Sequence, residues 1–456
     1  MSNLQALNEL FEIHQEEILK DYFTLLKFKS ISSEMEYKGE MLACASWLRD
    51  YFTQADFAVE LIETISNPLV LASWDKAGTD KPTLLVYGHY DVQPVDPLEL
   101  WQTPPFEPTI CTGQVFARGA NDDKGQFFFA VSAITTLLKQ NRTLPINIKI
   151  VLEGDEETGS NGLEDIIPKI ADKLKADYLA IIDVGLKNEN QPSITIGTRG
   201  IVSLTFELTE GNTDLHSGTF GGIAYNPNRA LAEILASFYD KNGRVLVNGF
   251  YDDVVMPSPT ELALLDISLN TDELKREYDL DCTGGEQEFK LEERKVLRPT
   301  LEINGMSGGY SGSGFKTVIP QKALAKISAR LVPKQEGSKI VTAICEHIKA
   351  RVPAGIKCNI IVHDNRGQAF RSNPQSKICR VCSQAFADVN GTTCATVLDA
   401  AAIPIAPTLA KYSGAETVLI GYGLDSDKIH APNEHFGLDR FKAGFITIGE
   451  IVELLG

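Results

Sequence analysis

Apolar residues in the first half of the chain alternate between short continuous runs and a longer stretch at helical spacing. The short runs are TLLVY from residue 83, INIKIVL from residue 146 and YLAII from residue 178. The helical stretch, KGQFFFAVSAITTLLKQ, lies between the first two runs. Strands that are apolar on both faces and separated by helices are typical of a parallel sheet covered by helices. The pattern therefore predicts an α/β fold with a mostly parallel sheet.

The two ends of the chain have the spacing of helices that pack against a core. Near the start, Leu7, Phe11 and Ile18 recur at helical spacing, and near the end Phe445 and Val452 lie on one stripe. The first residues show no basic segment followed by an apolar run, so we expect no export signal.

The periodicity changes near residue 198. The segments IVSLTFEL and ALAKISARLV alternate apolar and polar residues, which is typical of half-exposed strands. Asn226 and Pro227 are the residue types of a helix cap and a first helical position. Residues 337–352 have the spacing of a second helix, and 356–363 read as a strand. These elements predict a small α+β unit.

The two patterns divide the chain into two expected domains. A chain of 456 residues is about three times the commonest domain length, which also favours two domains. The acidic, loop-like stretch 268–295 cannot be assigned to either pattern. We expect a main domain formed by 1–197 and 372–456, interrupted by the α+β domain at 198–371.

Composition restricts the classes of partner and compartment. The formal net charge is -18, and no basic cluster reverses it locally, so we expect no nucleic acid partner. No apolar stretch approaches the roughly 18 residues that span a bilayer, so we expect a soluble protein without membrane association. Eight cysteines form no dense framework, which together with the missing export signal favours a reducing cytoplasm.

Residues that can bind metal follow three of the predicted strands. His89 follows TLLVY, Glu156 and Glu157 follow IKIVL, and Asp183 follows LAII. Because ligands of such sheets gather at the carboxyl ends of the strands, we expect these side chains at one edge. Two further motifs, RGANDDKG and KIHAPNEH, contribute Asp122 and His430.

Imidazole and carboxylate side chains suit zinc, with Mn²⁺ or Co²⁺ as alternatives, and two ions about 3.5 to 4 Å apart need one bridging carboxylate. We assign the bridge to Asp122. His89 and Asp183 then complete one site, and Glu157 and His430 complete the other. Asp91 lies two residues after His89, on the same side of an extended segment, where it can orient the imidazole. Glu156 can move a proton between water and a leaving amine.

Jointly, the motifs GHYDVQP, ARGANDDKG, EGDEETGS, TDLHSGTFGG and GFKTVIP closely resemble those of dinuclear zinc exopeptidases and deacylases. That family includes carnosinases, cytosolic non-specific dipeptidases, aminoacylases and succinyl-diaminopimelate desuccinylase, and the dipeptidase branch is the most similar. The resemblance implies the same five ligands, Glu156 as the base and Asp91 as the residue that orients the ring. It also implies a lid or dimerisation domain and a cis peptide between Asp122 and Asp123.

The resemblance implies roles for two residues of the inserted domain. His216 looks like a histidine that stabilises the oxyanion in the partner subunit's site, which makes a homodimer part of the mechanism. Arg330 is similar to an arginine that holds the substrate's terminal carboxylate, a geometry that suits guanidinium. Taken alone, however, His216 could cap a local turn, and Arg330 could be an ordinary exposed charge on a strand.

The chain departs from the dipeptidase pattern in one loop. Where carnosinase-like dipeptidases have Arg-Glu-Gly-Gly-Ser-Ile-Pro, this chain has Leu398 to Pro404 with Ala400, Ala401 and Ala402 in the middle. The expected function is hydrolysis of an amide bond in dipeptides or short peptides. One alternative is an N-acyl amino acid amidohydrolase, and a remote one is a non-catalytic peptide-binding protein on the same fold.

Several other residues have simpler interpretations. Taken one at a time, the proposed metal-site residues have ordinary structural interpretations. Glu156 and Glu157 would be a solvated pair, Asp183 would be a helix cap, and Asp122 would be a turn residue. The glycine-rich stretch NGMSGGYSGSGFKT is an improbable nucleotide loop, because Phe315 precedes the lysine and a strand is expected next. We expect structural roles for one cysteine pair and for four histidines. They are Cys379 and Cys382, and His14, His347, His363 and His435.

Overall fold

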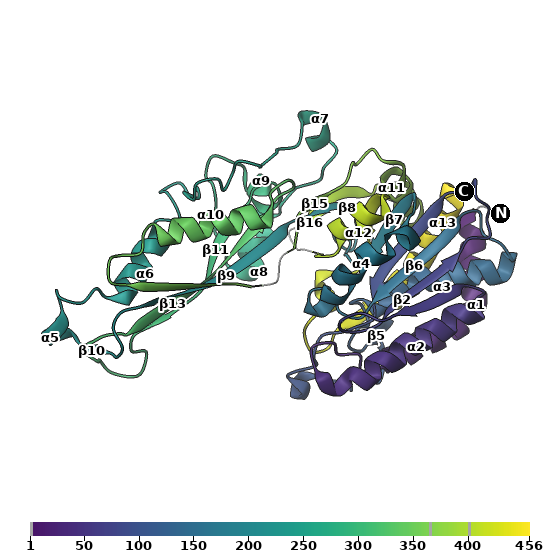
Figure 1. Ribbon diagram of the computed structural model, residues 1–456. Coiled ribbons are helices and arrows are strands. Elements are labelled where there is room, and N and C mark those ends of the chain that lie inside the picture. The colour runs from purple at the N-terminus through teal and green to yellow at the C-terminus, as the bar shows by residue number, and fades with distance from the viewer. Residues whose placement is uncertain (1–2, 364–366, 400–402) are drawn as a thin grey trace.

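The computed structural model describes residues 3–363, 367–399 and 403–456, which form two bodies side by side (Figure 1). The larger body holds a nine-stranded sheet and both ends of the chain, and the smaller body holds a four-stranded sheet. The chain leaves the large sheet after β8 (Ser193–Thr198) and returns at β15 (Phe370–Arg371), which pairs with β8. The predicted α/β fold with an inserted α+β unit is confirmed, whereas the exact domain limits remain a prediction.

The large sheet has the strand order β1-β2-β6-β3-β7-β17-β8-β15, with β16 also beside β8. Neighbouring strands are parallel from β6 through β3 and β7 to β17, and antiparallel pairs extend the sheet on both sides. The three apolar runs of the first half form β3, β6 and β7, as predicted. The bounds are β1 (Ala58–Ile62), β2 (Leu69–Trp74), β3 (Thr83–His89), β6 (Asn147–Glu153), β7 (Tyr178–Ile182), β16 (Ala395–Asp399) and β17 (Glu416–Ile420).

Helices cover both faces of this sheet. One face packs against α1 (Asn3–Leu26), α2 (Lys38–Gln54), α3 (Lys124–Asn141), α11 (Lys377–Asn390) and α13 (Leu438–Leu455). The other face packs against α4 (Asn161–Leu174) and α12 (Ala406–Ser413). Helix α3 is buried on nearly all sides, because its apolar residues surround the helix instead of forming one stripe. Asp123, the residue before α3, accepts a hydrogen bond of 3.0 Å from His89 N, so the helix begins beside the end of β3.

The inserted unit contains an antiparallel sheet in the order β11-β13-β9-β14. Val202, Leu204 and Phe206 on β9 lie in a core with α6 and α10, as their alternation predicted. The side chain of Asn226 accepts a hydrogen bond from Asn228 N and caps α6, also as predicted. The bounds are β9 (Gly200–Thr209), α6 (Pro227–Ala236), β11 (Thr300–Gly308), β13 (Lys322–Leu331), α10 (Gly337–Lys349) and β14 (Lys357–Val362).

The remaining elements of the insertion are short. The stretch 268–295, which its sequence left unassigned, contains α8 (Thr271–Tyr278) and the start of α9 (Leu291–Val296). A two-stranded pair, β10 (Leu215–His216) and β12 (Val318–Ile319), lies with α5 (Ser217–Phe220) at the end far from the large body (Figure 1). The glycine-rich stretch begins within β11 and leads into β12, so a strand follows it as predicted. Helix α7 (Pro259–Leu262) completes the insertion.

A small sheet of β18 (His435–Gly437), β5 (Gln114–Phe116) and β4 (Thr109–Cys111) packs on the core of the large body through Val115 and Phe436. Cys379 and Cys382 are fully buried on α11, in agreement with a structural role. Over the residues that the structure describes, no helix has both the length and the apolar character required to cross a membrane.

Candidate metal centre

The five residues expected to bind metal come from five separate segments of the large body. His89 is the last residue of β3, Asp183 follows β7, and Glu157 lies in the short 3-10 helix Glu156–Thr158 after β6. Asp122 lies in the loop before α3, and His430 lies in the loop before β18. Because β6, β3 and β7 are adjacent and parallel, their ends deliver these side chains to one edge of the sheet.

The structure brings all five side chains together in two groups that share Asp122. The groups are His89 with Asp122 and Asp183, and Asp122 with Glu157 and His430, and within each group the ligand atoms lie within 4.8 Å of one another. Asp122 Oδ1 lies 3.1 Å from His89 Nε2, and Asp122 Oδ2 lies 2.9 Å from His430 Nε2. Each oxygen of one carboxylate thus faces a different imidazole, which is the arrangement of a bridging ligand.

The acidic side chains outnumber the basic ones in this cluster. Burial, with the charges of nearby carboxylates, raises the pKa of Asp183 to about 6 and also raises the pKa of Glu157. Burial acts in the same direction on Asp122, but hydrogen bonds with His430 and His89 outweigh it and lower the pKa of Asp122. Hydrogen bonds to Asp122 and Glu157 raise the pKa of His430 to about 10. The cluster therefore favours positive charge at its centre.

The donor atoms fit a pair of divalent cations. Oε1 of Glu157 is buried and has no hydrogen-bond partner within the described residues, although such an atom normally has one. A bound cation would provide the missing partner. Imidazole nitrogens and carboxylate oxygens in this number suit zinc, and also manganese or cobalt.

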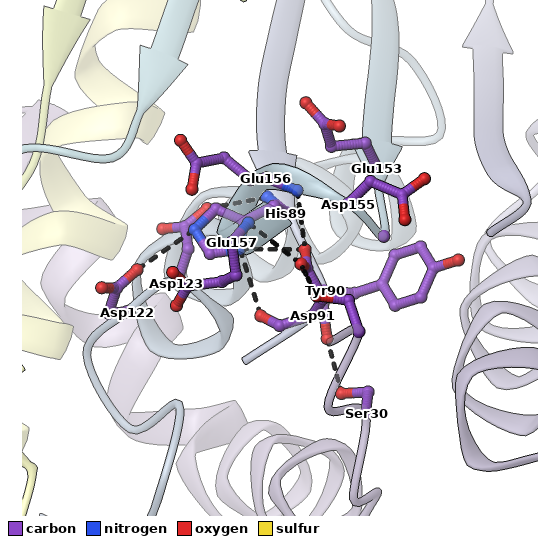
Figure 2. Close-up of polar contacts among 12 residues, drawn as sticks. Ser30, His89, Tyr90, Asp91, Asp122, Asp123, Glu153, Asp155, Glu156 and Glu157 are labelled. Carbon is purple, nitrogen blue, oxygen red and sulfur yellow. Dashed lines mark hydrogen bonds and ion pairs between the residues drawn. The ribbon is translucent and has the colours of Figure 1, made fainter. Parts of the chain in front are cut away.

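Asp91 holds two parts of the cluster at once (Figure 2). His89 Nδ1 lies 3.3 Å from Asp91 Oδ1 and 3.1 Å from the Asp91 carbonyl oxygen, so the segment can orient the imidazole as expected. The same carboxylate accepts hydrogen bonds from the backbone N–H groups of Glu156, at 3.2 Å, and Glu157, at 3.1 Å. The second contact was not expected from the sequence. It links the end of β3 to the turn after β6.

Glu156 has the properties of a proton carrier. Its carboxylate makes no hydrogen bond within the described part of the chain, while its backbone is held by Asp91. Burial, together with the nearby carboxylates of Asp183 and Glu157, raises the pKa of Glu156 well above its ordinary value. A glutamate in such surroundings can accept a proton at neutral pH and release it to a stronger base.

His216 and Arg330 do not join the cluster within one chain. His216 lies on β10 at the far end of the insertion (Figure 1), is exposed, and accepts a hydrogen bond from Gly218 N through Nδ1. It therefore caps a local turn, as one interpretation of the sequence required. Arg330 is half-buried on β13, opposite Thr300 and Ile201. Neither position tests the role that the resemblance implies.

Sequence reasoning missed several polar residues at this edge of the sheet, of which Gln93 and Glu434 contact proposed ligands. Gln93 Nε2 donates a hydrogen bond of 2.7 Å to Glu157 Oε2, and Gln93 follows Asp91 at a spacing that places both on one side of an extended segment. Glu434 and Asp427 are fully buried near the cluster. Glu153 accepts hydrogen bonds from the hydroxyl groups of Tyr87, at 2.5 Å, and Ser160, at 2.9 Å.

Three further sets of sequence predictions can be compared with the structure. The peptide bond between Asp122 and Asp123 is cis, as expected. The loop residues Ala400, Ala401 and Ala402 lie outside the described residues. The histidines expected to be structural all have partners: His14 pairs with Glu17, His347 with Ser237, His363 with Thr205, and His435 with the carbonyl group of Asn433.

A sheet edge that gathers two histidines and two carboxylates around a shared aspartate, with Glu156 beside them, defines a metal-dependent hydrolase of the α/β class. The chain belongs to peptidase family M20/M25/M40, whose model matches residues 85–454. It is therefore a hydrolase that acts on peptide bonds, with a candidate metal site at this edge.

Several proteins are similar to this chain over nearly its full length. It is 30% identical to the Cys-Gly metallodipeptidase dug1 of Schizosaccharomyces pombe, over 97% of this chain and 96% of that protein. It is 29% identical to the Beta-Ala-His dipeptidase of Rattus norvegicus, over 98% and 96% of the two chains. The M20 family metallo-carboxypeptidase Sso-CP2 from Sulfolobus solfataricus has a similar structure, with a TM-score of 0.84, 31% identity, and coverage of 96% of this chain and 99% of that one.

Glu153 predicts a pH dependence of stability in the metal-free protein. Burial raises the pKa of its carboxyl group to about 8 from 4.5, so the folded chain carries a proton that the unfolded chain loses. The contribution of Glu153 to the free energy of unfolding should therefore fall as the pH rises from about 4.5 to about 8, by about 1 kcal/mol or more over that range. Glu153→Gln removes this titration, so the stability of the wild type relative to that variant should decrease over the same range.

Denaturant unfolding in the presence of a chelator, at several pH values, measures this difference. Glu99→Gln makes the same substitution at an exposed glutamate and is the control. Parallel stability curves for the wild type and Glu153→Gln between pH 5 and 8 would contradict the assignment.

Proposed function

We propose that this chain is a two-zinc peptidase that cleaves the amide bond of dipeptides or short peptides at a free terminus. The observation that carries the proposal is the position of Asp122, whose two carboxylate oxygens face His89 and His430 separately. The names of the two relatives, one a Cys-Gly and one a Beta-Ala-His dipeptidase, support a dipeptide substrate. The free substrate terminus agrees with the carboxypeptidase of similar structure.

In this proposal each ion has one imidazole and one carboxylate of its own. His89 and Asp183 would hold the first, Glu157 and His430 would hold the second, and Asp122 would contribute one carboxylate oxygen to each. When bound, the two ions supply Lewis-acid activation of a water molecule and of the scissile carbonyl group. Asp91 keeps His89 in a fixed orientation, and Gln93 holds one oxygen of Glu157 through its side-chain amide.

Glu156 is the general base and then the general acid. It takes a proton from the attacking water, and the same carboxyl group later gives that proton to the leaving amine. The hydrogen bond from the Glu156 backbone to Asp91 keeps the residue beside the ligands, while its side chain stays unbonded and available. Its raised pKa brings proton uptake and release nearer to neutral pH.

Two residues of the insertion complete the proposed site in a cytoplasmic homodimer. His216 of the partner subunit donates a hydrogen bond to the oxyanion of the tetrahedral intermediate. Its Nδ1 accepts a bond from Gly218 N, so the neutral ring carries its proton on Nε2, where it is available to a substrate. Arg330 holds the terminal carboxylate of the substrate through its guanidinium group. The distance between β10 and the large body in one chain agrees with this use of a second chain (Figure 1).

The alternative substrate is an N-acyl amino acid. The motivation is the sequence at Ala400–Ala402, where carnosinase-like dipeptidases have glycines and a serine that contact the substrate. Such a change leaves the metal ligands in place and alters only the recognition of the substrate terminus. Both candidates use the same hydrolytic chemistry, and they differ in the group on the acyl side of the bond.

Replacing Glu156 by glutamine should abolish turnover without loss of metal. The amide keeps the shape of the side chain but cannot carry a proton, so kcat should fall by at least about 100-fold. Metal content, measured by atomic emission on pure protein, should remain that of the wild type. The adjacent variant Glu157→Gln should instead lose metal, because it changes a proposed ligand. Activity that survives in Glu156→Gln would exclude this residue as the base.

Mixing two inactive variants should restore activity if His216 acts across the dimer. A heterodimer of His216→Ala and Glu156→Gln subunits contains one site with both residues intact. Random exchange between two-fold dimers should recover about a quarter of the wild-type activity. The control mixes Glu156→Gln with a chain that carries both Glu156→Gln and His216→Ala. It should stay inactive, because no subunit then has Glu156. Absence of rescue, with subunit exchange demonstrated by differently tagged chains, would contradict the arrangement.

A substrate panel should separate the two candidate functions. With added zinc, manganese or cobalt, we expect kcat/KM to be highest for dipeptides with a free carboxylate. Values should be lower by about 10-fold or more for dipeptide amides, which lack the partner of Arg330. Preferential hydrolysis of N-acetyl or N-succinyl amino acids would favour the alternative. Inactivity on the whole panel would favour the non-catalytic peptide-binding role.

A further inference from the structure

The loop that presents His430 is not held in place by its own backbone. This His430 loop, residues 424–434, has only one short 3-10 helix, at Asp425–Asp427. Three of its non-glycine residues have left-handed backbone angles, with φ of 57° at Lys428, 59° at His430 and 67° at Asn433. Side chains rarely adopt such angles without support from their surroundings, and the side chain of His430 is 53% exposed. Contacts outside the loop must therefore determine where His430 lies.

Glu434 at the end of the loop is fully buried and accepts four hydrogen bonds. Its Oε2 accepts from Arg118 Nη1 at 2.8 Å and from Gly119 N at 2.9 Å. Its Oε1 accepts from the backbone N–H groups of Asn121 and Asp122, both at 3.0 Å. All four donors belong to residues 118–123, the Asp122 loop. One carboxylate thus joins the segment that carries His430 to the segment that carries the shared ligand.

Asp427 makes a second connection at the other side of His430. It is fully buried and pairs with Arg440 through two hydrogen bonds of 2.6 Å. It also accepts a hydrogen bond of 2.9 Å from the side-chain amide of Asn121. The His430 loop is therefore tied to the Asp122 loop on both sides of the exposed histidine.

Arg118 extends the connection to a third segment. Its Nη2 donates a hydrogen bond of 2.9 Å to the carbonyl oxygen of Pro94, and its guanidinium lies 5.3 Å from the centre of the Trp101 ring. Pro94 follows Gln93, the residue that donates to Glu157. The buried ion pair between Arg118 and Glu434 therefore connects the segments that control three of the proposed ligands.

We propose that Glu434 is a positioning residue that shapes the metal centre before any metal binds. By fixing the backbone of Asn121 and Asp122, it directs the two oxygens of Asp122 toward His89 and His430. This inference goes beyond the proposed function but relies on Asp122 and His430 as ligands. Glutamine cannot replace Glu434, because each carboxylate oxygen accepts two donors. Either orientation of the amide would place its NH₂ group against two N–H donors.

The test is metal binding by Glu434→Gln, measured by competition with a chelator on metal-free protein. We expect at least one of two equivalents of zinc to bind about 10- to 100-fold more weakly than in the wild type. The matched control is Glu286→Gln in the insertion. Glu286 is also buried and bonded to an arginine, Arg298, at 2.7 and 3.0 Å. Its loss removes a comparable ion pair without touching the ligands, so zinc affinity should be unchanged.

A measurement on the wild type keeps the proposal testable if Glu434→Gln does not fold. Hydrogen exchange of the metal-free protein should show protected amides at Gly119, Asn121 and Asp122, because Glu434 already binds them. Protection that arises only after zinc is added would overturn the proposal. Unchanged zinc affinity in folded Glu434→Gln would overturn it as well. A wild type that binds no metal would instead refute the proposed function, so the two failures are distinguishable.

Discussion

The close packing of negative charge at one edge of the sheet is the constraint on which the site depends. Asp122, Glu156, Glu157 and Asp183 lie together, with only two imidazoles to oppose them. An ionised carboxylate that leaves water without a partner costs several kcal/mol, so such groups take up protons or bind cations. The raised pKa of Glu156, Glu157 and Asp183 expresses that cost. The proposed metal binding and the proposed proton transfer by Glu156 would therefore have the same physical origin.

Such a cluster keeps its shape only if the backbone around it cannot relax. Part of the support comes from residues 28–32 near the start of the chain. Ser30 donates a hydrogen bond to the Tyr90 carbonyl group at 2.6 Å (Figure 2), and Ser32 donates to Asp91 at 2.7 Å. The buried ammonium group of Lys124 donates to the carbonyl oxygen of Phe28 at 2.8 Å. Segments that carry no ligand thus restrain those that do, in the same way as Glu434 restrains Asp122.

Local patterns in the sequence were sufficient for the framework and for the proposed ligands. Continuous apolar runs predicted β3, β6 and β7, and the residues that follow them could be placed at one edge because parallel strands end together. The helix α8 was not predicted, because its short charged sequence has no apolar stripe. The supporting role of Glu434 was beyond sequence reasoning, since its partners are backbone groups more than 300 positions away. Asp91 shows the same limit. Its contact with His89 could be predicted because the two residues lie two positions apart on an extended segment. Its contacts with Glu156 and Glu157 depend on how β3 and β6 lie together, so only the structure shows them.

The unequal burial of the two imidazoles gives the shared carboxylate two different environments. The side chain of His89 is 1% exposed, whereas that of His430 is 53% exposed. Asp122 Oδ1 therefore faces the protein interior, and Oδ2 faces a histidine in contact with bulk water. Electrostatic attraction is stronger in the interior, where polarisable solvent is excluded. If two ions bind as proposed, the ion beside the buried His89 would be held more strongly than the ion beside the exposed His430, and the ion beside His430 would be the first to exchange.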